Sequence, residues 1–374
     1  MDFSLSAEQQ ELRSSARRMM TRVATEEVLI AQQDQRTGYI APVWDQLSRA
    51  GWLGLGIPED FGGSGAMMSD FAVLLEEYGR GPLPQLFVVA SVLSPFLILE
   101  CGTSEQQKRW LPVLADGQER FTVASTEDEH GWEREHVSTT LTQDYGRLTV
   151  TGHKTFVPDI AGATKILVTA RHRDTGNIVL VLIDPADPAV DHHLVEGLVS
   201  WQSDLVLDKV AVAPGDIISA CTEDAWPGIR RAMLRCAPLL CSYQVGSCQA
   251  VFEMSLQHSK TRIQFGQPIG RFQRVQDHII ELVNHLDSAR WATYEALWKW
   301  DSAAESAAAS TYVAKAVVSE AHWEACNYAH EVHAGLGVDI TYGLAKHTNL
   351  SRSLYHFLGD PRANRAWMTR ELGW

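Results

Sequence analysis

The most informative part of this 374-residue sequence is the stretch Arg262-Ile263-Gln264-Phe265-Gly266-Gln267-Pro268-Ile269-Gly270-Arg271-Phe272. Its glycines and proline predict that one helix ends here and another begins. The surrounding segment, 254–276, carries four Lys and Arg residues and no acid, although the chain has a net charge of −14. Guanidinium groups and free backbone N–H groups at a helix junction together suit a diphosphate. For the charge cluster alone, a solvated basic helix end is the commoner interpretation.

The sequence on both sides of this stretch contains helical segments. From Trp226 to Arg370 proline is nearly absent and alanine is frequent, which favours long packed helices. Near the start of the chain, Ser6 and Gln9 have the spacing of a helix capping box. A glycine-rich loop is predicted over 54–65, followed by a helix over 71–79 that ends at Gly79.

The middle of the chain has a different pattern. Short apolar runs at 148–152, 165–170 and 178–183 are separated by Gly, Asp and Pro, which is typical of β-strands. The order of these patterns predicts an α+β fold in three domains. They are an N-terminal helical domain over 1–120, a central β domain over 121–225 and a C-terminal helical domain over 226–374.

Composition excludes several classes of function. With 32 Lys and Arg residues against 46 Asp and Glu residues, the chain is a poor candidate for binding nucleic acid or an anionic membrane surface. Its longest apolar run, 86–99, is interrupted and shorter than the roughly 20 residues of a membrane-spanning helix. The first residues lack the pattern of a signal peptide, and the six cysteines form no CxxC pair. We therefore expect a cytoplasmic protein that binds neither nucleic acid nor membranes.

Five collinear segments make the sequence resemble the acyl-CoA dehydrogenase family along essentially its whole length. They are Asp2-Phe3-Ser4-Leu5-Ser6-Ala7-Glu8-Gln9, Gly54-Leu55-Gly56-Ile57-Pro58-Glu59-Asp60-Phe61-Gly62-Gly63, Thr126-Glu127, the stretch 262–269 quoted above, and His333-Ala334-Gly335-Leu336-Gly337. Each segment alone is a weak signal, whereas five in the same order are a strong one.

The resemblance implies a fold, a reaction and partners. The fold would be an N-terminal helical domain, a central β domain and a C-terminal four-helix bundle, assembled as a tetramer. In the implied reaction, a carboxylate removes the proton α to the thioester carbonyl of an acyl-CoA, and the β-hydride passes to N5 of FAD. The FAD would lie across a subunit boundary, with electron-transfer flavoprotein as the electron acceptor.

The usual catalytic base of the family is absent. Most members carry a Glu followed by Gly-Thr near the C-terminus, where this chain has Leu358-Gly359-Asp360. A minority carry the Glu on the first helix of the C-terminal domain, but 230–237 contains no acid. The catalytic residue is therefore unassigned, and Asp360 and Glu127 are the candidates that we would test first.

The resemblance also divides the predicted FAD-binding residues into two halves. The accepting half, which a subunit builds for its own flavin, comprises Ser125, Thr126 and Phe156. It departs from the family pattern where 126–133 reads Thr-Glu-Asp-Glu-His-Gly-Trp-Glu and 156–158 reads Phe-Val-Pro. Trp132 and Pro158 stand where the family has a serine and a threonine, so hydroxyl donors are lost, and Pro158 also lacks a backbone N–H.

The donating half, which a subunit lends to its neighbour's FAD, is mostly preserved. It comprises Arg262, Gln264, Phe265, Ile269, Phe272, Glu331 and Gly335. Glu331 replaces a glutamine of the family, which places an acid near the expected pyrophosphate. In this difference between the halves, and in the segments Phe-Val-Pro (156–158) and Leu-Gly-Asp-Pro (358–361), the chain resembles the branch of the family that contains heteromeric enzymes of steroid side-chain degradation.

Three functions follow as alternatives. The first is a flavoprotein subunit that desaturates an acyl-CoA in lipid or steroid degradation, within a homo- or hetero-tetramer. The second is a catalytically silent subunit that completes the FAD site of an active partner. The third is a family member repurposed for other flavin or thioester chemistry.

His330 and His333 lie three residues apart on a predicted helix, a spacing that metal ligands can have. No third ligand has a suitable spacing, so we expect a polar pair near the cofactor motif and no metal.

Overall fold

The computed structural model describes residues 4–25, 27–29, 31, 38–128, 131–195, 202–219 and 223–374. The chain forms two compact units. Unit 1 comprises Met1–Ile30, Met67–Leu83 and Ala237–Trp374, and unit 2 comprises Ala31–Ala66 and Pro84–Cys236. Each unit combines segments that are far apart in the sequence. The division of the chain at residues 120 and 225 stays a prediction.

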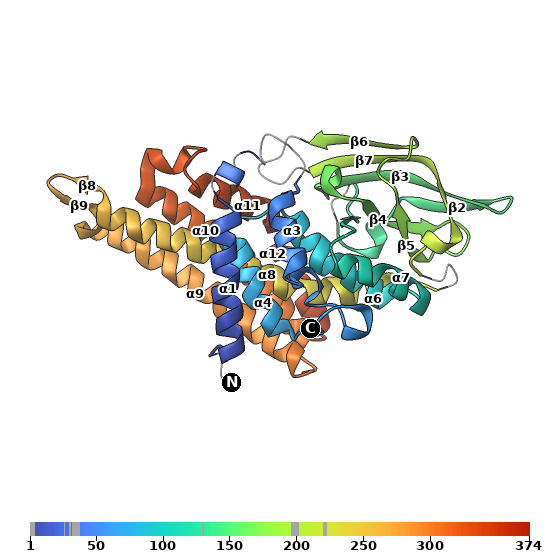
Figure 1. Cartoon of the computed structure of the whole chain (residues 1–374), viewed down its shortest axis with the longest axis horizontal. Helices are drawn as coiled ribbons and strands as arrows, with labels where there is room; N and C mark the ends of the chain where they lie inside the picture. Colours follow the sequence, from blue (N-terminus) through green and yellow to red (C-terminus); the bar gives the residue numbers. More distant parts are fainter. Residues whose placement is uncertain are drawn as a thin grey trace. The chain divides into compact units, whose positions relative to one another are not determined.

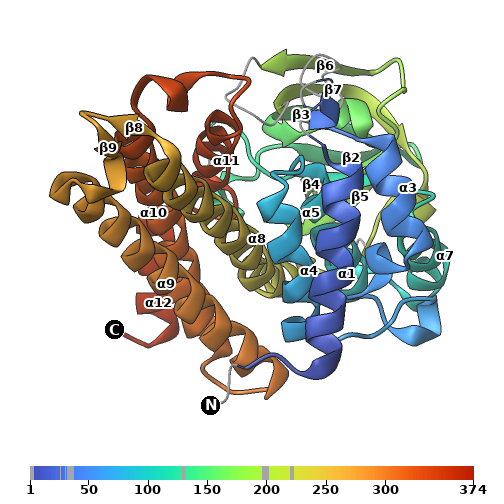
Figure 2. The same ribbon diagram turned by 60° about the vertical axis from the view of Figure 1, so that its left-hand side comes forward.

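Unit 1 is built from helices (Figures 1 and 2). They are α1 (Ala7–Val23), α4 (Met68–Arg80), α8 (Trp226–Thr261, from Ala237 onward), α9 (Gln273–Asp301), α10 (Ala307–His333), η8 (Ala334–Val338), α11 (Leu344–His356) and α12 (Pro361–Glu371). Side chains such as Val251, Leu286 and Val318 pack the core between α8, α9 and α10. The predicted capping box at the start of α1 is confirmed, because Ser6 Oγ accepts a hydrogen bond from Gln9 N (3.1 Å) and Gln9 Oε1 accepts one from Ser6 N (3.0 Å).

Two glycines let α4 and α8 touch backbone to backbone. A Cβ on Gly79 would lie 1.7 Å from the Tyr243 carbonyl oxygen, and a Cβ on Gly246 would lie 1.8 Å from the Glu76 carbonyl oxygen. The prediction that Gly79 ends its helix is wrong, because α4 continues to Arg80 and its C-cap is Gly81. Gly79 is required by helix packing rather than by helix termination.

Unit 2 surrounds one mixed sheet. The strands are β1 (Phe121–Ala124), β2 (Thr140–Asp144), β3 (Arg147–Pro158), β4 (Lys165–His172), β5 (Ile178–Ile183), β6 (Val190–Val195) and β7 (Gln202–Val212). Their order is β1-β4-β2-β3-β7-β6, and β5 pairs with β4. Only β1–β4 and β2–β4 are parallel. The predicted strands at 148–152, 165–170 and 178–183 lie within β3, β4 and β5, so these predictions are confirmed.

Besides the first part of α8, up to Cys236, the remaining elements of unit 2 are short helices. They are α3 (Ala41–Arg49), η1 (Trp52–Gly54), η2 (Glu59–Phe61), α5 (Leu86–Val88), the π-helical η3 (Val89–Leu93), α6 (Ser94–Cys101), α7 (Ser104–Ala115), η4 (Arg134–His136), η5 (Ile160–Gly162) and η6 (Pro214–Asp216). The sequence of helices, sheet and helices confirms the predicted α+β fold class. None of the described helices is long and apolar enough to cross a membrane.

Candidate functional site

A short hairpin joins α8 to α9 at the stretch quoted at the outset. Its strands are β8 (Ile263–Gln264) and β9 (Gln267–Pro268), and it projects beyond the ends of the two helices (Figure 1). Phe265 and Gly266 form the turn with φ angles of 51° and 79°, as a type I′ turn requires. The Phe265 side chain is 92% exposed. The sequence predicted the end of one helix and the start of another but not the hairpin, because Phe-Gly is not a usual signal for this turn.

The hairpin is tied to the helices at its base. The backbone N–H of Ile269 donates to the Arg262 carbonyl (2.9 Å), and the 3₁₀ turn η7 (Ile269–Arg271) leads into α9. The rings of Phe265 and Phe272 meet edge to face, with centroids 6.0 Å apart. The Gln264 side chain donates to the neighbouring Ile263 carbonyl (2.8 Å). The hairpin is therefore held at its base, while most of the Phe265 side chain stays exposed.

Arg262 is exposed at the start of the hairpin, and no described carboxylate forms an ion pair with it. Burial lowers the pKa of His258, and the nearby Arg262 charge lowers it further. The His258 ring stacks on His333 at the end of α10, with centroids 4.6 Å apart. Glu331 and Gly335 are exposed at this same end of unit 1, and nothing lies within 4 Å of the Cβ position of Gly335. Unit 1 therefore gathers the donating half at one end of its helices, where an unpaired guanidinium fits a phosphate.

The two candidate metal-binding histidines have other partners. His330 Nε2 lies 2.8 Å from Thr348 Oγ1, and His333 Nδ1 lies 2.8 Å from the Ala329 carbonyl. In the part of the chain that the structure describes, no three His, Cys, Asp or Glu side chains are arranged to hold a metal ion.

The accepting half lies in unit 2, beside β1 and on β3. A shift in register between Lys154 and Val157 turns Phe156 outward, with φ 54° and 42% of its surface exposed. Thr126 Oγ1 donates to the Thr155 carbonyl (2.5 Å), so its hydroxyl proton is already used. Ser125 Oγ is buried and has no hydrogen-bond partner among the described residues. The exposed Phe156 ring could contact a planar group, whereas the buried Ser125 Oγ and the engaged Thr126 Oγ1 leave this half with fewer available donors than the family pattern supplies.

Two residues of the 126–133 segment, Glu129 and His130, lie outside the described residues. So do Asp2 and Phe3 of the opening segment of the family resemblance. Pro158 is buried, and its carbonyl accepts a hydrogen bond from Thr122 Oγ1 (2.6 Å).

The position of the usual base offers no proton acceptor. Leu358 is 4% exposed and has a φ of 60°. Asp360 begins α12 as its N-cap, where its Oδ1 accepts a hydrogen bond from Ala363 N (2.7 Å). Asn364 Nδ2 donates to the Gly359 carbonyl (2.9 Å) and to the Asp360 carbonyl (3.0 Å). Asp360 therefore has a structural role that accounts for its presence.

The other candidate base, Glu127, is also engaged. The residue is buried, and its carboxylate accepts hydrogen bonds from Lys154 Nζ (2.7 Å), Ser138 N (2.8 Å) and Thr139 N (3.0 Å). Burial opposes ionisation of Glu127, but the Lys154 charge and these donors together outweigh burial and lower its pKa. A carboxylate with three donors and a lowered pKa is a weak base. Sequence reasoning missed Lys154, because its partner lies 27 residues away, in the segment that follows β1.

Comparisons with known proteins identify the family of this chain. The family model for the acyl-CoA dehydrogenase N-terminal domain matches residues 6–118, and the model for the C-terminal domain matches residues 226–372. The probable acyl-CoA dehydrogenase YngJ of Bacillus subtilis is 26% identical over 389 residues, covering 100% of both chains.

Solved structures have the same fold. A variant of the Tcur3481-Tcur3483 steroid ACAD is 27% identical, with a TM-score of 0.84 over 98% of each chain. An FAD complex of PigA is 23% identical, with a TM-score of 0.89 over 100% of this chain and 99% of that one, and supports the fold alone. The chain therefore belongs to the acyl-CoA dehydrogenase family.

Proposed function

We propose that this chain is a subunit of an FAD-dependent complex that desaturates an acyl-CoA at its α,β bond. In this complex it lends its donating half to the flavin of an active partner subunit and does not itself supply the base. The observation that carries the proposal is that none of the three residues considered for the base is available as one. Leu358 is a buried leucine, Asp360 caps a helix and the Glu127 carboxylate is paired with Lys154.

FAD, when bound, supplies the hydride acceptor of this reaction. Arg262 would hold a phosphate of the cofactor, since its guanidinium is exposed and has no described carboxylate partner. Phe265, at the tip of the hairpin, would bury its exposed ring against the partner. Both side chains are of use only across a subunit boundary, because the hairpin points away from its own helices.

Relatives within the family support a proposal for the substrate class and the other partners. The Tcur3481-Tcur3483 relative is a steroid ACAD, and the Phe-Val-Pro and Leu-Gly-Asp-Pro segments resemble the same branch. We extend the proposal to a heteromeric assembly of four subunits, a bulky acyl-CoA of lipid or steroid degradation, and electron-transfer flavoprotein as the acceptor.

The test compares the chain alone with the chain co-expressed with a homologue that keeps the family's catalytic glutamate. We expect the isolated chain to be colourless and the co-purified complex to contain flavin that bleaches on addition of an acyl-CoA. Light scattering of the complex should give the mass of four subunits, and a monomer would contradict the assembly.

Two results would overturn the silent-subunit proposal. If the isolated chain binds flavin and an acyl-CoA bleaches it rapidly, another carboxylate of this chain is the base. If it binds flavin that no acyl-CoA bleaches, the chain has been repurposed within the family.

A further inference from the structure

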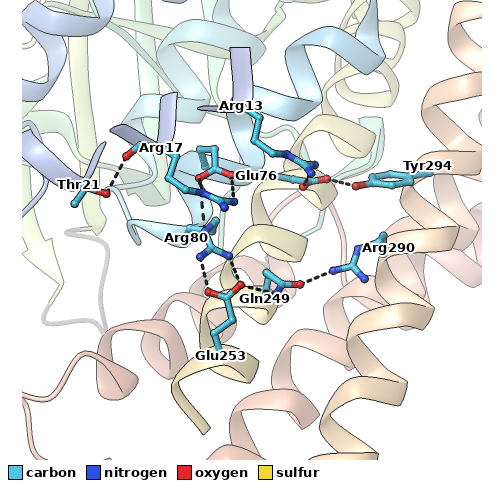
Figure 3. A network of polar contacts seen from close by, with 10 residues as sticks. Arg13, Arg17, Thr21, Glu76, Arg80, Gln249, Glu253, Arg290 and Tyr294 are labelled. Carbon is cyan, nitrogen blue, oxygen red and sulfur yellow. Dashed lines mark hydrogen bonds and ion pairs between the residues drawn. The ribbon is translucent and has the colours of Figure 1, made fainter. Parts of the chain in front are cut away.

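Unit 1 contains a second feature, remote in sequence from the hairpin, where α1, α4, α8 and α9 meet. A cavity of about 380 Å³ opens there beside the glycine contact between α4 and α8. This volume lies within the range of small-molecule sites. Charged side chains from all four helices surround it (Figure 3). They are Arg13, Arg17, Glu76, Glu77, Arg80, Glu253 and Arg290.

The three carboxylates of this cavity are already supplied with donors. Glu76 accepts from Arg13 (3.0 Å) and from the Tyr294 hydroxyl (2.7 Å). Glu77 accepts two hydrogen bonds from Arg17, at 2.7 and 3.0 Å. Glu253 accepts two from Arg80, at 2.6 and 3.1 Å (Figure 3). All three carboxylates are therefore paired, so none of them would need a bound cation to balance its charge.

Two of the four arginines, Arg13 and Arg290, keep unused donors. Each guanidinium has about five N–H groups. Arg13 uses one nitrogen in a hydrogen bond, and its Nε is buried without a partner. Arg290 uses two nitrogens, one on Gln249 (2.6 Å) and one on the half-exposed Asp287 (2.8 Å). Four guanidinium groups thus line the cavity against three carboxylates, so donors and positive charge are in excess, which an anion satisfies.

An apolar cavity adjoins the charged one. It occupies about 170 Å³ and shares Leu5, Glu76 and Tyr294 with its neighbour. Val73, Leu297 and Trp298 are among the side chains that line the rest of it. Trp298 is 39% exposed, so a ligand in this cavity would cover apolar surface that is otherwise in water. An anionic group in the first cavity could thus carry an apolar group into the second.

We propose that these two adjoining cavities bind a small anionic amphiphile, with its carboxylate or phosphate on the guanidinium groups and a short apolar chain against Trp298. The site is separate from the donating half, and the inference does not depend on the proposed function. Binding would link α1 and α4 to α9 through one ligand.

The test is calorimetric titration of the full-length chain with three probes: octanoate, octyl phosphate and inorganic phosphate. We expect octanoate or octyl phosphate to bind at least tenfold more tightly than inorganic phosphate, because only these two have an apolar chain. The stronger of the two identifies the head group.

Two pairs of variants locate the site. Arg290→Gln should weaken binding of the preferred probe about tenfold or more, since it removes a charge-assisted contact. Arg18→Gln is its control, because Arg18 is exposed on α1 and pairs with Glu11 outside the cavity. Trp298→Ala should weaken binding of the amphiphile but not of inorganic phosphate. Ile280→Ala, an exposed position on α9 that does not line either cavity, is the matched control.

The proposal is overturned if neither amphiphile binds at millimolar concentration, or if Arg18→Gln weakens binding as much as Arg290→Gln. Equal binding of inorganic phosphate and the amphiphiles would also overturn it. If Arg290→Gln does not fold, the difference between Trp298→Ala and Ile280→Ala decides the question alone.

Discussion

Lys154 Nζ lies 2.7 Å from Glu127 Oε1, and the two side chains are 0% and 8% exposed. The pair connects β3 to the segment that follows β1. Glu127 also accepts the backbone N–H groups of Ser138 and Thr139, at the entry to β2. Lys154 donates in addition to Thr169 Oγ1 on β4 (2.9 Å). One buried ion pair thus holds together four parts of the sheet: β3, β4, the segment after β1 and the entry to β2.

We predict that Lys154→Met lowers the free energy of unfolding by about 3–5 kcal/mol, because it leaves the buried Glu127 carboxylate without its cation. Urea unfolding followed by circular dichroism measures the change. The control is Lys165→Met, which removes the partly exposed Lys165–Asp184 pair on the same sheet and should cost less than about 1 kcal/mol. Equal losses in the two variants would show that Glu127 does not need Lys154.

Substitution of Asp360 separates capping from catalysis. Asp360→Ala removes the N-cap of α12 and should destabilise the protein by about 1 kcal/mol, whereas Asp360→Asn keeps a capping oxygen and should cost little. Neither should change the rate of flavin bleaching by acyl-CoA in the assembled complex. A large loss of bleaching in the stable Asp360→Asn variant would instead identify Asp360 as the base.

Three polar side chains form a chain of hydrogen bonds inside unit 1. Ser247 Oγ lies 2.7 Å from His347 Nδ1 and 2.8 Å from His322 Nε2, and Ser247 and His322 are fully buried. Burial lowers the pKa of both histidines to about 3, from an ordinary value of 6.5. Both are therefore neutral in the folded protein at neutral pH and join α8, α10 and α11 without a charge.

This arrangement predicts acid sensitivity. Between about pH 6.5 and pH 3 the unfolded chain binds protons at these histidines and the folded chain does not, so stability rises with pH and falls on acidification. Each histidine contributes a slope of up to about 1.4 kcal/mol per pH unit. Urea unfolding at several pH values should show a smaller slope in His322→Gln. Ser247→Ala, which keeps both titrating groups, should lower stability but retain the slope, and a slope unchanged in His322→Gln would refute the assignment.

Loss of Arg262 tests the donating half directly. Arg262→Ala should reduce flavin retention in the assembled complex about tenfold or more, since a charge-assisted contact to phosphate is removed. The ratio of flavin to protein absorbance after gel filtration gives the occupancy. Arg274→Ala removes an equal charge from the start of α9, outside the predicted FAD-binding residues, and should retain flavin. Equal occupancy in Arg262→Ala and the unaltered complex would remove Arg262 from the site.

Features set by neighbouring residues could be predicted from the sequence. The Ser6–Gln9 capping box and the strands β4 and β5 depend on short spacings that a linear pattern contains. The prediction for Gly79 is wrong because a glycine in a helical pattern resembles a helix end. A glycine is needed at this position because the carbonyl of Tyr243, on another helix, leaves no room for a Cβ.

The candidate site likewise has some features that a linear pattern contains and others that depend on packing. Position 358 and the motif Thr126-Glu127 could be located by resemblance, but the engagement of Glu127 by Lys154 depends on strand pairing. The charged cavity is lined by residues that are far apart in the sequence: Arg13 and Glu76, which are hydrogen-bonded to each other, are separated by 63 positions. No pattern within one helix indicates which face will meet such a partner, because helix packing decides it.

The β8–β9 hairpin has only two residue pairs, and so short a ribbon gains little stability from its own hydrogen bonds. In the proposed complex, where the hairpin holds a cofactor belonging to another chain, two binding equilibria are joined into one cycle. By thermodynamic linkage, the factor by which the hairpin strengthens flavin binding is the factor by which flavin strengthens subunit association. The Kd between subunits should therefore be lower when flavin is bound, and cells short of flavin should contain more of this chain unassembled.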